Sequence, residues 1–342
     1  MSELHEIIKM LDLVFINVAI PYLTFKACDK YRIRKIYKHK KIIKVSVPPK
    51  FKRKYDGIVL NKIDNQEFRE AILEFSKVLA EHFPSKALTN FYNNINELKI
   101  KNNKVIELIG AVGCYSPLSN SITLSDSSSI YHELFHMASR SYGKQNGVIY
   151  TGFRQRNIKI SKILYNDLGL GLNEGYTELL AHRYFGNKAY SSYDFETDIA
   201  NKLEMIIGQD KMTELYLRGD LAGLIAELRV YMPEDEIIKF ITRLDLITGY
   251  DSKLRKIIVR ESVFDIYEFL LTTYALKLKK QYENGLINLN DFESLSNNYL
   301  ESFNNQVYLA SENYELKNLY EMYKNILNNI NAPGNIIKGS SR

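Results

Sequence analysis

Cysteine is scarce in this chain of 342 residues, which contains only Cys28 and Cys114. Two cysteines are too few for the disulfide framework of a small secreted domain, and without CxxC spacing they exclude a metal site built from thiolates. We therefore expect two reduced thiols. The composition is 45% hydrophobic and 25% charged, as in ordinary folded proteins, and it argues against intrinsic disorder.

The N-terminal part of the chain also lacks a long apolar run. Residues 13–25 are apolar apart from Asn17 and Thr24, but this stretch falls short of the about 20 residues that a membrane-spanning helix needs. Acidic residues, Glu3 and Glu6, occupy the opening positions where a secretory signal would be basic. We expect a cytoplasmic location, with this stretch forming either a packed helix or a helix on a membrane surface.

Positive charge is concentrated just after this stretch. Residues 26–54 contain thirteen Lys or Arg residues against one acid, Asp29, in a chain whose net charge is +6. A segment of this kind can attract an anionic membrane surface or nucleic acid, although most basic runs are simply solvated surface.

The predicted secondary structure falls into a mixed first part and a helical second part. Apolar residues recur at the helical period across residues 64–83, and Pro84 ends that helix. Residues 105–124 are rich in β-formers and interrupted by turn residues, which predicts two strands joined by a hairpin. Beyond Asp194 the pattern predicts a series of amphipathic helices.

The strand expected at residues 121–124 leads into a helix that carries the sequence HELFH at 132–136. This helix is expected to begin after Ser125 and to run to about Tyr142, where Gly143 stops it. Histidines four positions apart lie about 40° from each other on one helix face and can bind one metal ion. The apolar side of this helix is expected to face the core, and the histidines to face away from it.

A third metal ligand is expected from a second helix. Residues 148–153 predict a short strand, and the helix is expected to begin with Asn173 as its N-cap and to run through Phe185. Glu174 and Glu178 share one side of this helix. Glu174 can therefore complete a set of three ligands, and Glu178 can accept a hydrogen bond from the second ring nitrogen of a ligand histidine.

These residues resemble the gluzincin branch of the zincin metallopeptidases, in which HExxH is followed by a second helix that supplies a glutamate ligand. The resemblance spans about residues 110–185. It implies one zinc ion bound by His132, His136 and Glu174. It further implies that Glu133 is the general base that activates the zinc-bound water for hydrolysis of a peptide bond.

Other zinc-binding patterns fit less well. The metzincin extension requires glycine at position 139 and histidine at position 142, where this chain has Ser139 and Tyr142. His182 stays open as an alternative third ligand, because it lies one turn beyond Glu178. In thermolysin-like gluzincins an aspartate occupies the position of Glu178.

The resemblance also implies an oxyanion donor and a strand that binds the substrate. Gluzincins often use a tyrosine or histidine as the donor, and the tyrosines close in sequence are Tyr150, Tyr190 and Tyr193. We favour Tyr193, because it follows the second helix after a short loop. The edge strand that binds the substrate backbone corresponds to residues 110–115 or to its hairpin partner.

We expect an α+β fold with a zincin-like domain at about residues 56–190. It follows an N-terminal segment at residues 1–55 and precedes a helical region at 191–330 and a flexible tail at 331–342. The expected function is zinc-dependent hydrolysis of peptide or protein substrates. Two alternatives stay open: a catalytically silent zincin-fold interaction module, and a membrane-surface or nucleic-acid binding protein that uses residues 26–54.

Overall fold

The computed structural model describes most of the chain after the basic segment. The described residues are 63, 65–102, 112–143, 147–157, 167–186, 192–248, 252–303 and 313–333. The expected N-terminal helix, the basic segment 26–54, Tyr190 and residues 334–342 lie outside this part. The division of the chain near residue 190 stays a prediction.

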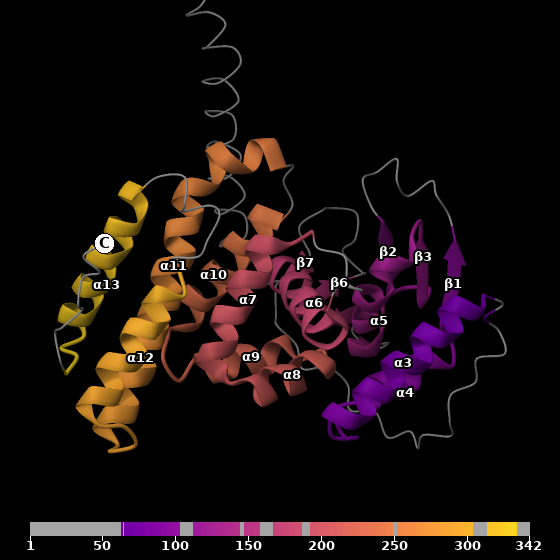
Figure 1. Ribbon diagram of the computed structural model, residues 1–342, viewed down its shortest axis with the longest axis horizontal. Coiled ribbons are helices and arrows are strands. Elements are labelled where there is room, and N and C mark those ends of the chain that lie inside the picture. The colour runs from indigo at the N-terminus through magenta and orange to yellow at the C-terminus, as the bar shows by residue number, and fades with distance from the viewer. Residues whose placement is uncertain are drawn as a thin grey trace, which may run out of the picture.

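The described chain is an α+β structure in which helices predominate and the strands form two small sheets. The helices are α3 (Gln66–His82), α4 (Thr89–Ile95), α5 (Ile130–Ser139), α6 (Leu170–Phe185), α7 (Asp194–Ile207), α8 (Gln209–Leu217), α9 (Leu221–Leu228), α10 (Glu234–Thr248), α11 (Ser252–Glu283), α12 (Leu289–Glu301) and α13 (Asn313–Asn329). The strands are β1 (Lys99–Asn102), β2 (Gly113–Ser116), β3 (Ser121–Leu124), β4 (Arg140–Gly143), β5 (Val148–Thr151), β6 (Arg154–Asn157) and β7 (Asp167–Leu168). In Figure 1, β1–β3 and helices α3 and α4 lie at one end of the molecule, α11–α13 lie at the other, and α5 and α6 lie between them.

The first sheet contains the predicted hairpin. β2 pairs antiparallel with β3, so that Gly113 lies opposite Leu124, and β1 pairs parallel with β3 on its other side. β2 is therefore an edge strand of this sheet as described. The helix predicted at residues 64–83 is confirmed as α3. A short 3₁₀ turn, capped by the Asp126 side chain, joins β3 to α5.

Helix α5 ends earlier than the sequence predicted, because the residues after it join the second sheet. The helix stops at Ser139, and residues Arg140–Gly143 form β4, which pairs antiparallel with β5. The predicted end near Tyr142 is thus wrong, because pairing with a strand later in the chain replaces the last helical turn. The strand predicted at residues 148–153 is confirmed as β5, which continues through a tight hairpin into β6.

Helix α6 begins before the predicted N-cap. Its first residue is Leu170, and its N-cap is Gly169, whose φ of +84° lies in the left-handed region that favours glycine. Asn173 lies inside the helix and is buried, so its predicted role as N-cap is wrong. The cap comes instead from Asp245 of α10, whose carboxylate accepts hydrogen bonds from the backbone N–H groups of Gly169 (2.8 Å) and Gly171 (2.9 Å).

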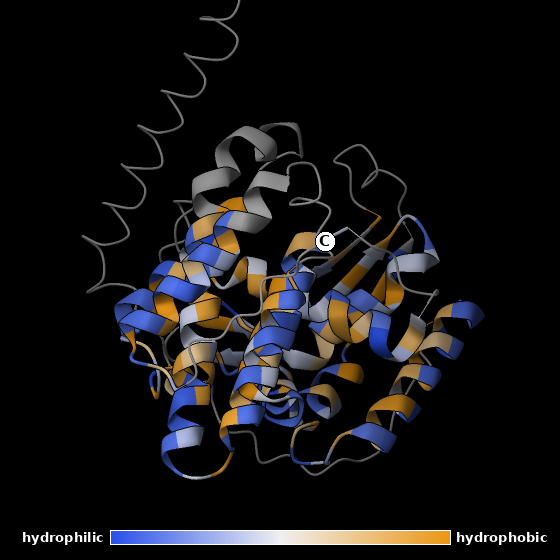
Figure 2. Ribbon diagram, turned by 60° about the vertical axis from the view of Figure 1, so that its left-hand side comes forward, coloured by the Kyte–Doolittle hydropathy of each residue, from blue (hydrophilic) through white to orange (hydrophobic). Residues whose placement is uncertain are grey.

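One hydrophobic core joins the mixed part of the fold to the C-terminal helices. It runs from Ile63 to Ala332 without a break into separate clusters among the described residues. Helices α6 and α7 pack closely because Gly175 lacks a side chain: a Cβ at this position would lie 2.1 Å from the backbone oxygen of Glu196. Figure 2 shows hydrophilic and hydrophobic residues on the same helices, as expected for amphipathic helices around a core.

None of the helices in the described ranges combines the length and the apolar character that crossing a bilayer requires.

We predict that Asp245→Ala lowers the free energy of unfolding by about 1–3 kcal/mol, because two buried N–H groups at the start of α6 lose their acceptor. Urea denaturation followed by circular dichroism measures the change. Glu236→Ala is the matched control, since Glu236 lies on the same helix and pairs with Lys239 on the surface. The control is expected to cost less than about 0.5 kcal/mol. Equal stability of the two variants would contradict the capping role.

Candidate metal centre

Helix α5, which carries the HELFH sequence, is buried along its whole length. All ten of its residues are buried, and His132, Glu133 and His136 are only 6–7% exposed. The sequence did not predict this burial; both histidines nevertheless line a polar cavity on the side of the helix away from the apolar core. Helices α3, α4 and α6 and strands β2 and β5 pack around α5, so the polar side of the helix faces other protein elements.

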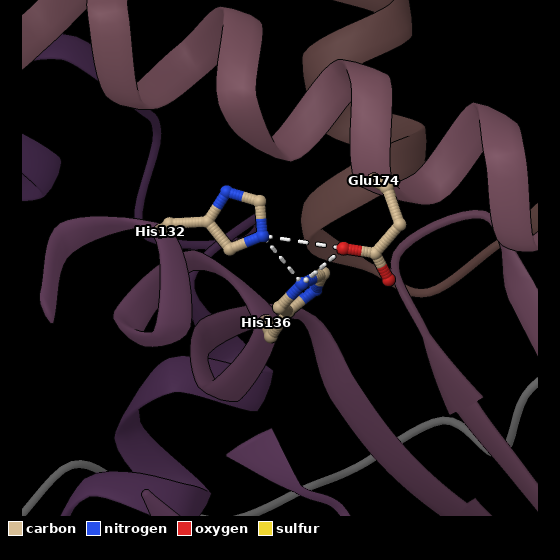
Figure 3. A group of neighbouring side chains, drawn as sticks. All are labelled: His132, His136 and Glu174. Carbon is tan, nitrogen blue, oxygen red and sulfur yellow. Dashed lines mark hydrogen bonds and ion pairs between the residues drawn. The ribbon is translucent and has the colours of Figure 1, made fainter. Parts of the chain in front are cut away.

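The structure brings His132, His136 and Glu174 together. Glu174 Oε2 lies 3.2 Å from His132 Nε2 and 3.1 Å from His136 Nε2, and the two Nε2 atoms lie 3.0 Å apart. Figure 3 shows the two imidazoles of α5 and the carboxylate of α6 converging on one point. Among the described residues, no other three His, Cys, Asp or Glu side chains offer ligand atoms this close together.

These distances suit a tetrahedrally coordinated metal ion. Two ligand atoms at about 2.0–2.1 Å from a tetrahedral ion lie about 3.3–3.4 Å apart, slightly more than the 3.0–3.2 Å between the three atoms here. Two imidazole nitrogens and one carboxylate oxygen are common metal ligands. The buried group can therefore hold a metal ion through three protein atoms and leave a coordination position open.

His136 is oriented by residues on α6 that the sequence did not indicate. Its Nδ1 lies 3.2 Å from the Asn173 side-chain amide and 3.3 Å from Thr177 Oγ1. Asn173 Oδ1 is buried without a hydrogen-bond partner. Because the oxygen and nitrogen of an amide are nearly identical in shape, rotating this group by 180° lets Oδ1 accept the Nδ1 proton. The Nε2 lone pair of His136 is then free to bind a metal ion.

Glu174 is ionised in this arrangement. Burial opposes its negative charge, but the electrostatic and hydrogen-bond contacts of the carboxylate with His136 and His132 outweigh that cost. The pKa of the Glu174 carboxyl is consequently held well below its usual range. A buried carboxylate between two imidazoles favours a bound cation at the point where the three side chains meet.

Glu133 lies beside this group and against the edge strand β2. Burial raises the pKa of its carboxyl to about 7; the charge of His132 opposes this, Glu174 adds to it, and a hydrogen bond from the backbone N–H of Tyr115 lowers it again. A Cβ at Gly113 would lie 2.9 Å from Glu133 Oε1 and 2.2 Å from Ser129 Oγ. The glycine therefore lets β2 pass directly alongside the Glu133 carboxylate.

A cavity of about 350 Å³ opens onto these side chains. Its walls come from α5, α6, β2, the β5–β6 hairpin and the segment that contains Ser192 and Tyr193. His132, Glu133, His136 and Glu174 all line it. The group that can hold a metal is thus accessible to a small ligand or to part of a larger one.

Tyr193 is the predicted oxyanion donor that the structure places in the cavity. Its ring stacks on that of His132, with centroids 5.9 Å apart and planes inclined by 19°. The charge of Glu174 and burial raise the pKa of the Tyr193 hydroxyl, which therefore stays protonated and able to donate. Of the other two candidates, Tyr150 is buried within β5, 1% exposed, and Tyr190 lies outside the described residues.

Glu178 holds the segment that carries Tyr193. Its carboxylate accepts hydrogen bonds from the backbone N–H groups of Ser192 (3.0 Å) and Tyr193 (3.1 and 3.2 Å). The predicted hydrogen bond from a ligand histidine to Glu178 stays a prediction. His182, the alternative third ligand, lies 4.0 Å from Glu178 and is not part of the three-ligand group.

Comparison with models of protein families, with curated proteins and with solved structures finds no match to this chain.

Proposed function

We propose that this chain is a zinc-dependent metallopeptidase with a zincin-like catalytic domain. The observation that carries the proposal is the convergence of His132, His136 and Glu174 at distances of 3.0–3.2 Å, with the Glu133 carboxylate beside them. Three protein ligands with one open position are typical of catalytic zinc, whereas structural zinc sites have four protein ligands.

The ligand types favour a transition metal such as zinc over magnesium and calcium. Magnesium and calcium prefer oxygen ligands, and this group offers two imidazole nitrogens and one carboxylate. A bound zinc ion would polarise a substrate carbonyl and lower the pKa of a coordinated water toward neutrality.

Glu133 is the proposed general base. Its carboxyl lines the cavity beside the three proposed ligands, where it can take a proton from water and return it to the leaving nitrogen. Tyr193 is the proposed donor to the oxyanion, because its hydroxyl is protonated and its ring is stacked on a ligand histidine. Glu178 then acts as a positioning residue for Tyr193 through its backbone N–H.

The edge strand favours a peptide over a smaller substrate. β2 lines the cavity at Gly113, Cys114 and Tyr115, and within the described part of the chain β3 is the strand that pairs with it, on one side. An extended peptide can add to such an edge through main-chain hydrogen bonds, which would place a scissile carbonyl close to Glu133.

We predict that the purified protein binds one zinc ion per chain, and that His136→Ala and Glu174→Gln each remove it. Asn173→Ala is expected to weaken binding by about 10–100-fold, since it releases the His136 ring. Competition with a fluorescent chelator measures the affinities, and elemental analysis measures the stoichiometry. His182→Ala is the matched control and should keep a full zinc ion. Loss of zinc in this control, with retention in Glu174→Gln, would make His182 the third ligand instead.

We further predict that Glu133→Gln lowers hydrolysis of a random peptide mixture by about 10²–10⁴-fold while zinc content stays at one per chain. Mass spectrometry of the digest and elemental analysis of the same sample provide the two readouts. Glu174→Gln is the same chemical change at a proposed ligand, and it is expected to lose zinc and hydrolysis together. Unchanged hydrolysis in zinc-loaded Glu133→Gln would contradict the proposed mechanism.

A further inference from the structure

One cationic side chain contributes to the wall of the cavity. Arg154 is the first residue of β6 and lies opposite Thr151 across the β5–β6 hairpin, and both residues line the cavity. Register partners in an antiparallel pair project from the same face of a sheet, so the hairpin presents the two side chains together. Among the described residues of the cavity wall, no other Lys or Arg is present.

Arg154 is incompletely paired. It donates to Asp167 through Nη2, and its Nε is buried without a hydrogen-bond partner. Arg156 makes the fuller pair with the same carboxylate, donating from Nε at 3.0 and 3.1 Å and from Nη2 at 2.9 Å. Two guanidinium groups therefore share one carboxylate, and a positive charge is left over at the cavity wall.

The nearby acids do not remove this charge, because each of those that line the cavity has its own contacts. Glu133 accepts the backbone N–H of Tyr115, Glu174 faces the two histidines, and Glu178 accepts backbone N–H groups of Ser192 and Tyr193. Asp245 does not line the cavity and accepts the N–H groups of Gly169 and Gly171; burial raises its pKa, and the charge of Arg154 offsets only part of this rise. The Arg154 side chain is 22% exposed, so an anion that reaches it is only partly screened by water.

We propose that Arg154 binds a carboxylate of the substrate, and that the cavity therefore selects peptides that carry an acidic side chain or a free C-terminal carboxylate near the scissile bond. This inference rests on the proposed peptidase function. A guanidinium has a fixed planar array of donors that matches a carboxylate, and hydrogen bonds of this charged kind are stronger than neutral ones.

A purely structural role for Arg154 makes a different prediction. Arg154 and Arg156 both hold β7 to β6 through Asp167, and Arg156 does so with more hydrogen bonds. If pairing with Asp167 were the only role, replacing Arg156 would perturb the protein at least as much as replacing Arg154. Arg156 does not line the cavity, so Arg156→Met is the matched control.

The test uses the full chain loaded with zinc and carrying Glu133→Gln, so that bound peptides are not consumed. A peptide library contains each sequence in four forms, with Glu or Gln at one internal position and with a free or amidated C-terminus. Mass spectrometry measures which forms the immobilised protein retains. The comparison is made with Arg154 intact, with Arg154→Met and with Arg156→Met.

We expect the carboxylate forms to be retained about tenfold or more over the amide forms. This ratio should fall to about one in Arg154→Met and persist in Arg156→Met. A Glu over Gln preference identifies a side-chain carboxylate, and a preference for the free C-terminus identifies the terminal one. If Arg154→Met does not fold, Arg154→Lys replaces it and should reduce the ratio without abolishing it, because lysine keeps the charge and loses the planar array.

Equal retention of the acid and amide forms, including no retention of either, would overturn the assignment, as would a preference that persists without Arg154. Hydrolysis is measured separately on the same library with Glu133 intact. Cleavage without a carboxylate preference would leave the peptidase proposal standing and remove the role of Arg154. Arg154-dependent retention without any cleavage would support carboxylate binding by Arg154 and contradict the peptidase proposal.

Discussion

The contact of Glu174 with the imidazoles of His132 and His136 is the interaction on which the rest of the site depends. A carboxylate that is 8% exposed is stable only where positive charge or hydrogen bonds compensate for its lost hydration. Two histidines from α5 supply part of that compensation, and a metal ion bound between the three side chains would complete it. Helices α5 and α6 are held together by a tightly packed interior, in which Gly175, one residue after Glu174, lets α7 approach α6 closely.

The same packing arranges the other groups around the cavity. Gly113 brings the backbone of β2 against Glu133, and Glu178 fixes the segment of Tyr193 through two backbone N–H groups. The β5–β6 hairpin adds Arg154 from a different sheet. An acid with a pKa near neutrality, a protonated phenol and a guanidinium thus surround one buried ligand group, each held by a separate element of the fold.

The sequence was informative where function depends on short spacing. HELFH at 132–136 indicated two histidines on one helix face, and helix-face reasoning together with the family resemblance indicated Glu174, which lies beside both histidines. The sequence could not predict features that depend on contacts between distant parts of the chain. The cap of α6 comes from Asp245, 74 residues after Gly171. Local sequence patterns cannot reveal such a distant partner, and they predicted Asn173 as the cap instead. Likewise, amphipathic spacing identifies the apolar side of α5 but does not reveal that other elements cover its polar side.

X-ray absorption at the zinc edge of the purified protein would identify the atoms bound to the ion. We expect a first shell of nitrogen and oxygen at about 2.0–2.1 Å with the outer-shell signature of two imidazoles. A shell that contains sulfur at about 2.3 Å, one with the signature of three imidazoles, or the absence of bound zinc would contradict this expectation.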